Sequence, residues 1–211
     1  MRITKIGHSC LLLEEQGARI LIDPGAWTTA QNELGDIALV LVTHEHEDHL
    51  QLDSLQTILQ HNPRAVVVTT HAVGKILDSA QISYQILAHG QQMNYGAVTV
   101  AGWGEHHAPI YSSVPVVANT GYLIADRFFY PGDALYVPGK PVEILALPVA
   151  GPWLKMAEAL DYAQVIKPQH CFPVHDGMLQ IFGPFHALPQ QVLAAANIKF
   201  QPLLAGQALE F

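Results

Sequence analysis

Cysteine is scarce in this 211-residue sequence, which contains only Cys10 and Cys171. A chain of this length can bury enough apolar surface to be stable without covalent cross-links, so nothing indicates a disulfide scaffold. No run of 18 apolar residues is present, and the N-terminal residues lack the long apolar core of a signal peptide. We therefore expect no membrane span and a cytoplasmic protein.

Charged residues are also few, at 13% of the chain, and the formal net charge is −8 with only ten Lys and Arg. Nucleic-acid binding usually needs a basic face, so this balance weighs against a nuclease. Half of the residues are hydrophobic, and Pro and Gly are scattered as turn residues without forming a linker. A single domain covering residues 1–211 is the simplest interpretation.

Short apolar runs bounded by turn residues predict β-strands at 10–14, 18–23, 37–42, 65–69, 98–101, 120–125, 128–130, 144–147, 165–167 and 172–174. Apolar residues at helical spacing and helix-ending signals predict helices at 50–60, 71–79, 153–162 and 189–196. Strands dominate both halves, with helices interleaved but without strict alternation. This order favours an α+β fold in which helices cover two mixed sheets.

Histidine, by contrast, is abundant, with twelve residues. Four potential metal ligands occur within the hexapeptide His44-Glu45-His46-Glu47-Asp48-His49, between the predicted strand 37–42 and the helix that follows it. In an extended stretch alternate side chains point the same way, so His44 and His46 can share one metal. Asp48 and His49 lie at the turn into the helix and can face a second point. The hexapeptide therefore predicts two adjacent metal sites.

Two alternatives bear on this segment. A polar surface loop could be rich in histidine without binding metal, but the pattern His-x-His-x-Asp-His is expected by chance in only roughly one or two such chains per thousand. Glu45 and Glu47 lie between the candidate ligands, and we expect them to face away from the metals.

The hexapeptide resembles the signature of the metallo-β-lactamase superfamily. The short length and the start Gly7-His8-Ser9-Cys10 look more like the lactonase-like branch and its uncharacterised metal-dependent hydrolase relatives. The resemblance implies a four-layer αβ/βα sandwich with the metal site at one edge of two packed sheets. It also implies three further ligands downstream, a His, an Asp and a His, each following a strand.

The sequence offers these three residues in that order. The first is His106 or His107, and we favour His107 because similar sequences carry their histidine directly before a small residue. The second is Asp133, in a Gly-Asp turn after the predicted strand 128–130. The third is His175, after the predicted strand 172–174.

The resemblance thus implies seven ligands divided between two divalent metal ions. Metal one would be bound by His44, His46 and His107, and metal two by Asp48, His49 and His175. Asp133 would bridge the two ions. Nitrogen-rich ligation favours zinc, with manganese, iron and nickel as alternatives. Asp48 is also the predicted catalytic residue, because its free oxygen can hold the attacking hydroxide in position.

Four further residues are candidates for supporting roles. We expect Asp23 to orient an imidazole, or else to form a turn. His8 could line the site or be a buried structural histidine. Trp153 and Lys155 could line a substrate pocket, the alternatives being helix packing and a solvated lysine. We expect Cys171 in the core. The isolated histidines are expected at the surface or at helix caps: His61, His71, His89 and His186.

Three functions compete on this evidence. We favour metal-dependent hydrolysis of a small ester, lactone, amide or phosphoester, because no appended domain is visible. The alternatives are an RNA- or DNA-processing metallo-nuclease and a non-catalytic metal-binding regulatory module. The expected partner is a small-molecule substrate, with no nucleic acid and no membrane. A homo-oligomer stays open, because Leu203, Leu204 and Phe211 could pack inside the chain or against a partner.

Overall fold

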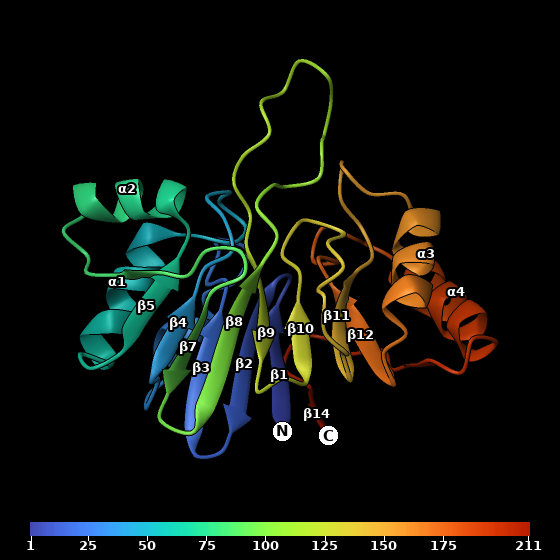
Figure 1. Cartoon of the computed structure of the whole chain (residues 1–211), viewed down its shortest axis with the longest axis horizontal. Coiled ribbons are helices and arrows are strands. Elements are labelled where there is room, and N and C mark those ends of the chain that lie inside the picture. Colours follow the sequence, from blue (N-terminus) through green and yellow to red (C-terminus); the bar gives the residue numbers. More distant parts are fainter.

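Two seven-stranded sheets pack face to face, and two helices cover the outer face of each sheet (Figure 1). The computed structural model describes all residues from 1 to 211. This arrangement is the four-layer sandwich implied by the resemblance, and the predicted fold class is confirmed.

The first sheet contains β1 (Arg2–Gly7), β2 (Cys10–Glu15), β3 (Ala18–Ile22), β4 (Leu39–Leu41), β5 (Val66–Thr69), β6 (Gln85–Ile86) and β14 (Ala208–Glu210). Its strand order is β14-β1-β2-β3-β4-β5-β6. The pairs from β14 to β3 are antiparallel, and those from β3 to β6 are parallel. The helices α1 (Leu52–His61) and α2 (His71–Ser79) cover it, and a short 3-10 helix spans Ala30–Glu33.

The second sheet contains β7 (Gln92–Tyr95), β8 (Val98–Trp103), β9 (Gly121–Ile124), β10 (Phe128–Tyr130), β11 (Ile144–Pro148), β12 (His170–Val174) and β13 (Lys199–Phe200). The strand order is β13-β12-β11-β10-β9-β8-β7. Here too antiparallel pairing between β7 and β10 gives way to parallel pairing between β10 and β13. The helices α3 (Met156–Ile166) and α4 (Gly183–Ala194) cover this sheet.

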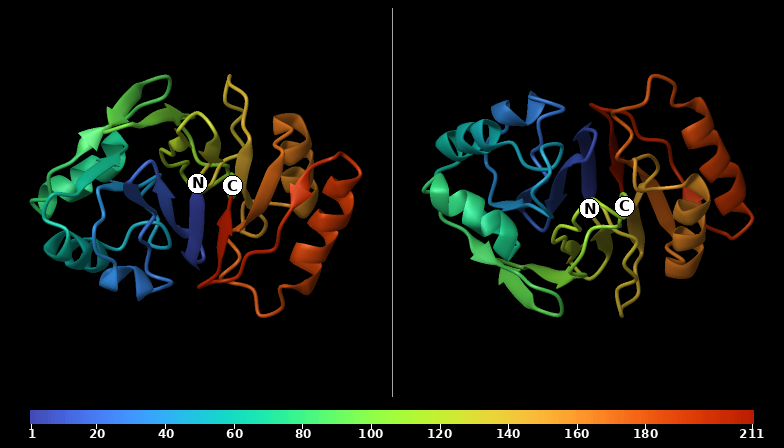
Figure 2. Two further views of the ribbon diagram at one scale, coloured as in Figure 1. Left: turned by 90° about the horizontal axis from the view of Figure 1, so that it is seen from below. Right: turned by 90° about the horizontal axis from the view of Figure 1, so that it is seen from above.

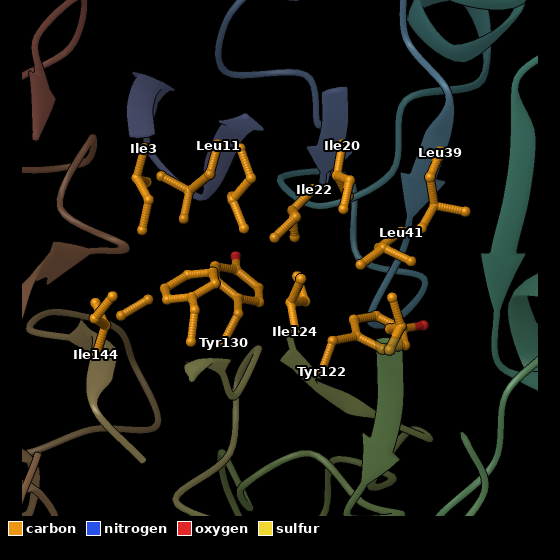
Figure 3. Close-up of a cluster of buried hydrophobic side chains, with 14 of the residues drawn as sticks. Ile3, Leu11, Ile20, Ile22, Leu39, Leu41, Tyr122, Ile124, Tyr130 and Ile144 are labelled. Atoms are coloured by element: carbon orange, nitrogen blue, oxygen red, sulfur yellow. The ribbon is translucent and has the colours of Figure 1, made fainter. Parts of the chain in front are cut away.

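Side chains that alternate along the strands divide between the inner and outer faces of each sheet. On β2, Leu11 and Leu13 enter the core between the sheets, while Cys10 and Leu12 pack beneath the helices of the first sheet. Figure 3 shows the inner core, where side chains from the two sheets face each other: Ile3, Leu11, Ile20, Ile22, Leu39 and Leu41 against Tyr122, Ile124, Tyr130 and Ile144. This double-sided burial explains why several strands are apolar at consecutive positions.

The two chain termini lie side by side at one end of the sandwich (Figure 2). Met1 and Phe211 exchange two backbone hydrogen bonds, of 2.7 and 2.8 Å. Leu203 is buried in the inner core, Phe211 packs against that core, and Leu204 is exposed. None of the helices is both long and apolar enough to cross a bilayer.

The structure corrects two predicted elements. The predicted strand 165–167 is wrong, because residues 165 and 166 form the last turn of α3 and Lys167 ends that helix in a left-handed conformation, with φ 54°. The predicted helix 189–196 begins earlier, at Gly183, and Pro189 lies within it. β1 was not predicted, because Lys5 occupies an inward-facing position and interrupts the apolar alternation.

Candidate metal centre

The loops that carry the predicted ligands meet at the end of the sandwich opposite the termini (Figure 1). The 44–49 loop connects β4 to α1, and the other loops follow β8, β10 and β12. Gly25, after β3, lets the 44–49 loop approach closely, because a Cβ on this glycine would lie 2.0 Å from the Asp48 carbonyl oxygen. The Ser9 hydroxyl donates to that same oxygen at 3.0 Å and also holds the loop in place.

Two groups of side chains come together there, and within each group the potential ligand atoms all lie within 4.8 Å of one another. The first group, which we call cluster one, contains His44, His46, His107 and Asp133. The second, cluster two, contains His8, Asp48, His49 and His175. All seven predicted ligands are thus brought together, with His8 as an eighth member.

Asp133 lies between the clusters. Its Oδ2 is 3.3 Å from His107 Nε2 in cluster one and 2.9 Å from His175 Nε2 in cluster two, and its Oδ1 is 3.1 Å from His49 Nε2. Gly132 makes this placement feasible, because it adopts φ 64° and a Cβ there would lie 2.3 Å from the Asn119 side-chain oxygen. The same oxygen accepts the Asp133 backbone N–H at 3.1 Å. A single carboxylate is therefore positioned to bridge two ions.

The histidines of the centre are oriented by acceptors on their outer nitrogens. His175 Nδ1 donates to the Ala150 carbonyl oxygen at 2.8 Å, and His107 Nδ1 donates to the Ala108 carbonyl oxygen. His49 Nδ1 lies 2.6 Å from Asp23 Oδ2. A proton held on Nδ1 leaves the lone pair on Nε2, the atom that faces the cluster, which is the arrangement typical of metal-bound histidine.

Asp23 is fully buried and reaches a second imidazole through Thr43. The Thr43 hydroxyl donates to Asp23 Oδ2 at 2.7 Å, so its oxygen is free to accept from His44 Nδ1 at 2.9 Å. The Thr43 backbone N–H also donates to Asp23, at 2.8 Å. One buried carboxylate thus orients a histidine in each cluster, which is the role expected from the sequence.

A group of buried polar atoms without hydrogen-bond partners marks the same place. His49 Nε2, His107 Nε2, His175 Nε2 and Asp133 Oδ1 are all buried and unpartnered within the protein. Buried polar atoms are normally satisfied, and imidazole nitrogens gathered around a carboxylate are a typical ligand set for divalent metal ions. The residues present therefore fit two divalent metal ions.

The ionisation of the side chains agrees with cation binding. Burial lowers the pKa of His44 and His46, and neighbouring imidazoles lower each further, so both stay neutral. Burial alone would raise the pKa of Asp133, but His49 and His175 hold it well below its usual range. Burial alone would likewise lower the pKa of His175, but the Asp133 carboxylate raises it to about 9, so without a metal ion Nε2 also carries a proton, which a bound cation would displace. The carboxylate is thus anionic and attracts positive charge.

His8 differs from the other imidazoles in its hydrogen-bond polarity. Its Nδ1 accepts the Gly177 backbone N–H at 3.0 Å, and burial lowers its pKa to about 4, so the ring is neutral with its single proton on Nε2. That N–H donates to Asp48 Oδ2 at 3.1 Å. The ring lies 4.2 Å from both the Trp27 and His175 rings. His8 is therefore arranged to donate a hydrogen bond to Asp48, not to offer a lone pair to a metal.

The structure distinguishes several residues that the sequence left open. His107 is buried in cluster one, whereas His106 is exposed and lines an adjacent pocket. Neither Glu45 nor Glu47 belongs to a cluster. Trp153 is buried, and its indole N–H donates to Asp133 Oδ2 at 2.8 Å.

The structure also bears on the expectations for Lys155, Cys171 and His186. The Lys155 side chain is 83% exposed, so the solvated alternative fits it, and Cys171 is fully buried as predicted. The expectation that His186 is a surface or capping residue is wrong. It is buried, and its Nε2 lies 3.0 Å from Asp176 Oδ2, because α4 packs onto the turn after His175.

A buried charged pair beside the centre escaped sequence analysis altogether. Lys5, on β1, donates to Asp176 Oδ1 at 2.5 Å and to the carbonyl oxygens of Pro173 and Leu203 at 3.0 and 3.2 Å. Asp176 follows His175, which adopts a left-handed conformation with φ 60°. The pair therefore anchors the turn that presents His175. The only signal in the sequence is a lysine at an inward-facing position of a strand.

Residues 2–175, well over half of the chain, match the family described as the β-lactamase superfamily domain. The protein belongs to the metallo-β-lactamase superfamily. It is similar to protein Rv0786c of Mycobacterium tuberculosis, at 35% identity over 184 residues that cover 85% of each chain. It is also similar to a UPF0173 metal-dependent hydrolase of Carboxydothermus hydrogenoformans, at 26% identity with 83% of this chain and 84% of that one covered. Among solved structures, the metallo hydrolase Igni18 from Ignicoccus hospitalis has the same fold, with a TM-score of 0.74, 22% identity, and coverage of 100% of this chain and 98% of that one.

Proposed function

We propose that this protein is a metal-dependent hydrolase that binds two divalent metal ions and cleaves a small ester, lactone, amide or phosphoester. The observation that carries the proposal is the pair of clusters joined by Asp133, with four buried, unpartnered ligand atoms turned inward. Curated relatives that carry the name metal-dependent hydrolase support it.

The donor set indicates which ions the site holds and what they contribute. Cluster one would bind its ion through His44, His46 and His107, cluster two through Asp48, His49 and His175, and Asp133 would bridge. Five imidazoles favour zinc over the harder ions that prefer oxygen. Bound zinc would lower the pKa of water from about 15.7 to about 7 and polarise the scissile carbonyl or phosphoryl group.

The surrounding residues prepare the centre for this chemistry. Asp48 is half-buried, and although burial alone would raise its pKa, the neighbouring imidazoles of His175 and His8 hold that pKa well below its usual range. Its carboxylate stays ionised, so it can orient the nucleophilic water. The Trp153 N–H donates to Asp133 and fixes the orientation of its carboxylate. These residues pre-organise the site, so little reorganisation is needed during the reaction.

The test combines metal analysis with activity. Purified protein should contain two metal ions per chain, and chelation should abolish hydrolysis of a panel of esters, lactones, amides and phosphodiesters. Asp48→Ala should retain fewer metals and lose at least about 100-fold in kcat. Asp126→Ala is the matched control, because its carboxylate is exposed and pairs only with Lys140. Full activity with two metals in Asp48→Ala, or chelator-resistant activity, would refute the proposal.

A further inference from the structure

Three buried polar side chains that the proposed chemistry does not use adjoin cluster two: Lys5, Asp176 and His186. The Lys5 ammonium donates to Asp176 Oδ1 at 2.5 Å, and His186 Nε2 lies 3.0 Å from Asp176 Oδ2. Because an ionised carboxylate only accepts hydrogen bonds, His186 donates from Nε2. Both oxygens of Asp176 are therefore held by buried donors. We call these three residues the anchor network.

The anchor network joins three elements of the fold. Lys5 lies on β1, Asp176 in the turn after β12, and His186 on α4. Lys5 also donates to the carbonyl oxygens of Pro173, on β12, and Leu203, at 3.0 and 3.2 Å. Because each carboxylate oxygen is held from a different element, the carboxylate cannot turn without losing a partner. The turn after β12 is thus fixed against both β1 and α4.

The residues on either side of Asp176 both act on cluster two. His175, the predicted ligand, has φ 60°, and its N–H donates to the His8 carbonyl oxygen at 3.2 Å. The Gly177 N–H donates to His8 Nδ1 at 3.0 Å and so selects the tautomer whose Nε2–H donates to Asp48. A Cβ on Gly177 would lie 2.8 Å from the His8 Cβ, so this contact leaves no room to shift. Movement of residue 176 would disturb both imidazoles.

The loops that present cluster one are supported by other residues. Asp23 and Thr43 orient His44, and the Ala108 carbonyl oxygen accepts from His107. None of these residues hydrogen-bonds to the anchor network. Breaking the network should therefore loosen one cluster and spare the other.

We propose that Asp176, held by Lys5 and His186, is a positioning residue that determines how tightly cluster two holds its metal ion. This inference rests on the proposed function. The intact network keeps His175 in place as a ligand and keeps His8 in the tautomer that donates to Asp48. When the network is broken, the second ion binds more weakly, and the enzyme holds a single ion at limiting metal concentration.

The first experiment measures both zinc affinities of metal-free protein in competition with a chelator. His186→Phe keeps an aromatic ring beside Phe182, whose ring centroid lies 5.5 Å away, but removes the donor to Asp176. It should weaken one of the two zinc ions about tenfold or more and leave the other within about twofold. His186→Gln restores a side-chain N–H donor and should recover part of that affinity. Equal weakening of both ions, or no weakening in His186→Phe, would overturn the inference.

Two further variants guard against a loss of folding or packing. Lys5→Met breaks the network from the side of β1 and should show the same selective loss of one zinc ion. His170→Phe is the matched control, because this histidine lies at the other end of β12 and pairs only with Gln201, at 3.3 Å. It should leave both zinc affinities unchanged. The inference fails if Lys5→Met weakens neither ion, or if the control shows the same loss as His186→Phe.

A double variant tests whether the network acts through His175. His175→Ala removes a ligand of cluster two, so only the ion in cluster one should bind tightly. Adding His186→Phe in this background should change the remaining zinc affinity by less than about twofold, because the two changes share one path. A general loss of packing would weaken this ion as well, and that result would contradict the proposal.

The same measurements separate this inference from the proposed function. If wild-type protein binds two zinc ions and hydrolyses its substrates, but His186→Phe and Lys5→Met bind both ions as tightly, only the role of the anchor network is refuted. If wild-type protein binds no zinc, the proposed hydrolase is itself refuted.

Discussion

Replacing Lys5 by methionine should lower the free energy of unfolding by about 3–5 kcal/mol, the cost of removing one partner of a buried ion pair. The Lys5 side chain is 2% exposed, and its ammonium makes three short contacts. Methionine fills much of the same space but leaves the buried Asp176 carboxylate with only His186 as a side-chain partner. The loss arises from this stranded charge more than from lost packing.

The pKa of Lys5 points to the same cause. Burial lowers this pKa, and the attraction of Asp176 only partly opposes the shift. Desolvation therefore outweighs the attraction, and the intact pair is not itself a large source of stability. Removing both charges together should cost less than removing one. The double variant Lys5→Met/Asp176→Asn should recover at least half of the loss.

The assay is urea and thermal unfolding of the protein, with its metal content held constant, at neutral pH. For a domain of this size, each kcal/mol corresponds to roughly 2–4 °C, so Lys5→Met should lower Tm by roughly 6–20 °C. Lys140→Met is the matched control, because its pair with Asp126 has side chains 42% and 57% exposed and should contribute less than about 1 kcal/mol. The reasoning fails if Lys5→Met costs no more than the control, or if the double variant is no more stable than the single one.

Three further predictions concern other parts of the structure. Asp23→Ala should weaken zinc binding about 10–100-fold in a chelator competition, because it removes the acceptor that orients His49, and an unchanged affinity would contradict this role. His8→Gln should keep two metals per chain but lower kcat, because His8 donates to Asp48; loss of one metal would instead make it a ligand. Burial raises the pKa of the Cys171 thiol from 9.0 to about 12, so it stays protonated when folded while the unfolded chain ionises. Its contribution to stability should therefore fall as the pH rises between these values, and a thiol reagent should modify it only on unfolding; rapid labelling of the folded protein would refute this.

The parts of the site that could be predicted are those encoded locally. The hexapeptide begins one residue after an apolar run and precedes a helical pattern, so strand, ligand loop and helix are all visible within about 25 consecutive residues. Asp133 and His175 likewise follow apolar strands. Their order along the chain, together with the family resemblance, was sufficient to nominate them, although periodicity alone could not show that they meet.

The features that sequence analysis missed depend on contacts distant in the chain. Lys5 and Asp176 are separated by 171 positions, and no local pattern connects them. β1 pairs with β14, so an edge strand of three residues gains its structure from the opposite end of the chain. The apolar pair at 165 and 166 suits either a strand or a helix, and here the packing of the preceding turns of α3 against the second sheet decides for the helix.

The roles of the histidines show why composition alone could not assign the chemistry. His8 and His175 have rings 4.2 Å apart, and both belong to cluster two. The difference between them lies in the backbone. His175 Nδ1 faces the Ala150 carbonyl oxygen, which requires a proton on Nδ1 and leaves Nε2 free to bind metal. His8 Nδ1 faces the Gly177 N–H, which requires the opposite tautomer and makes Nε2 a donor. Backbone polarity, set by the loops at the ends of β11 and β12, therefore decides which imidazole can bind an ion and which can hold the Asp48 carboxylate.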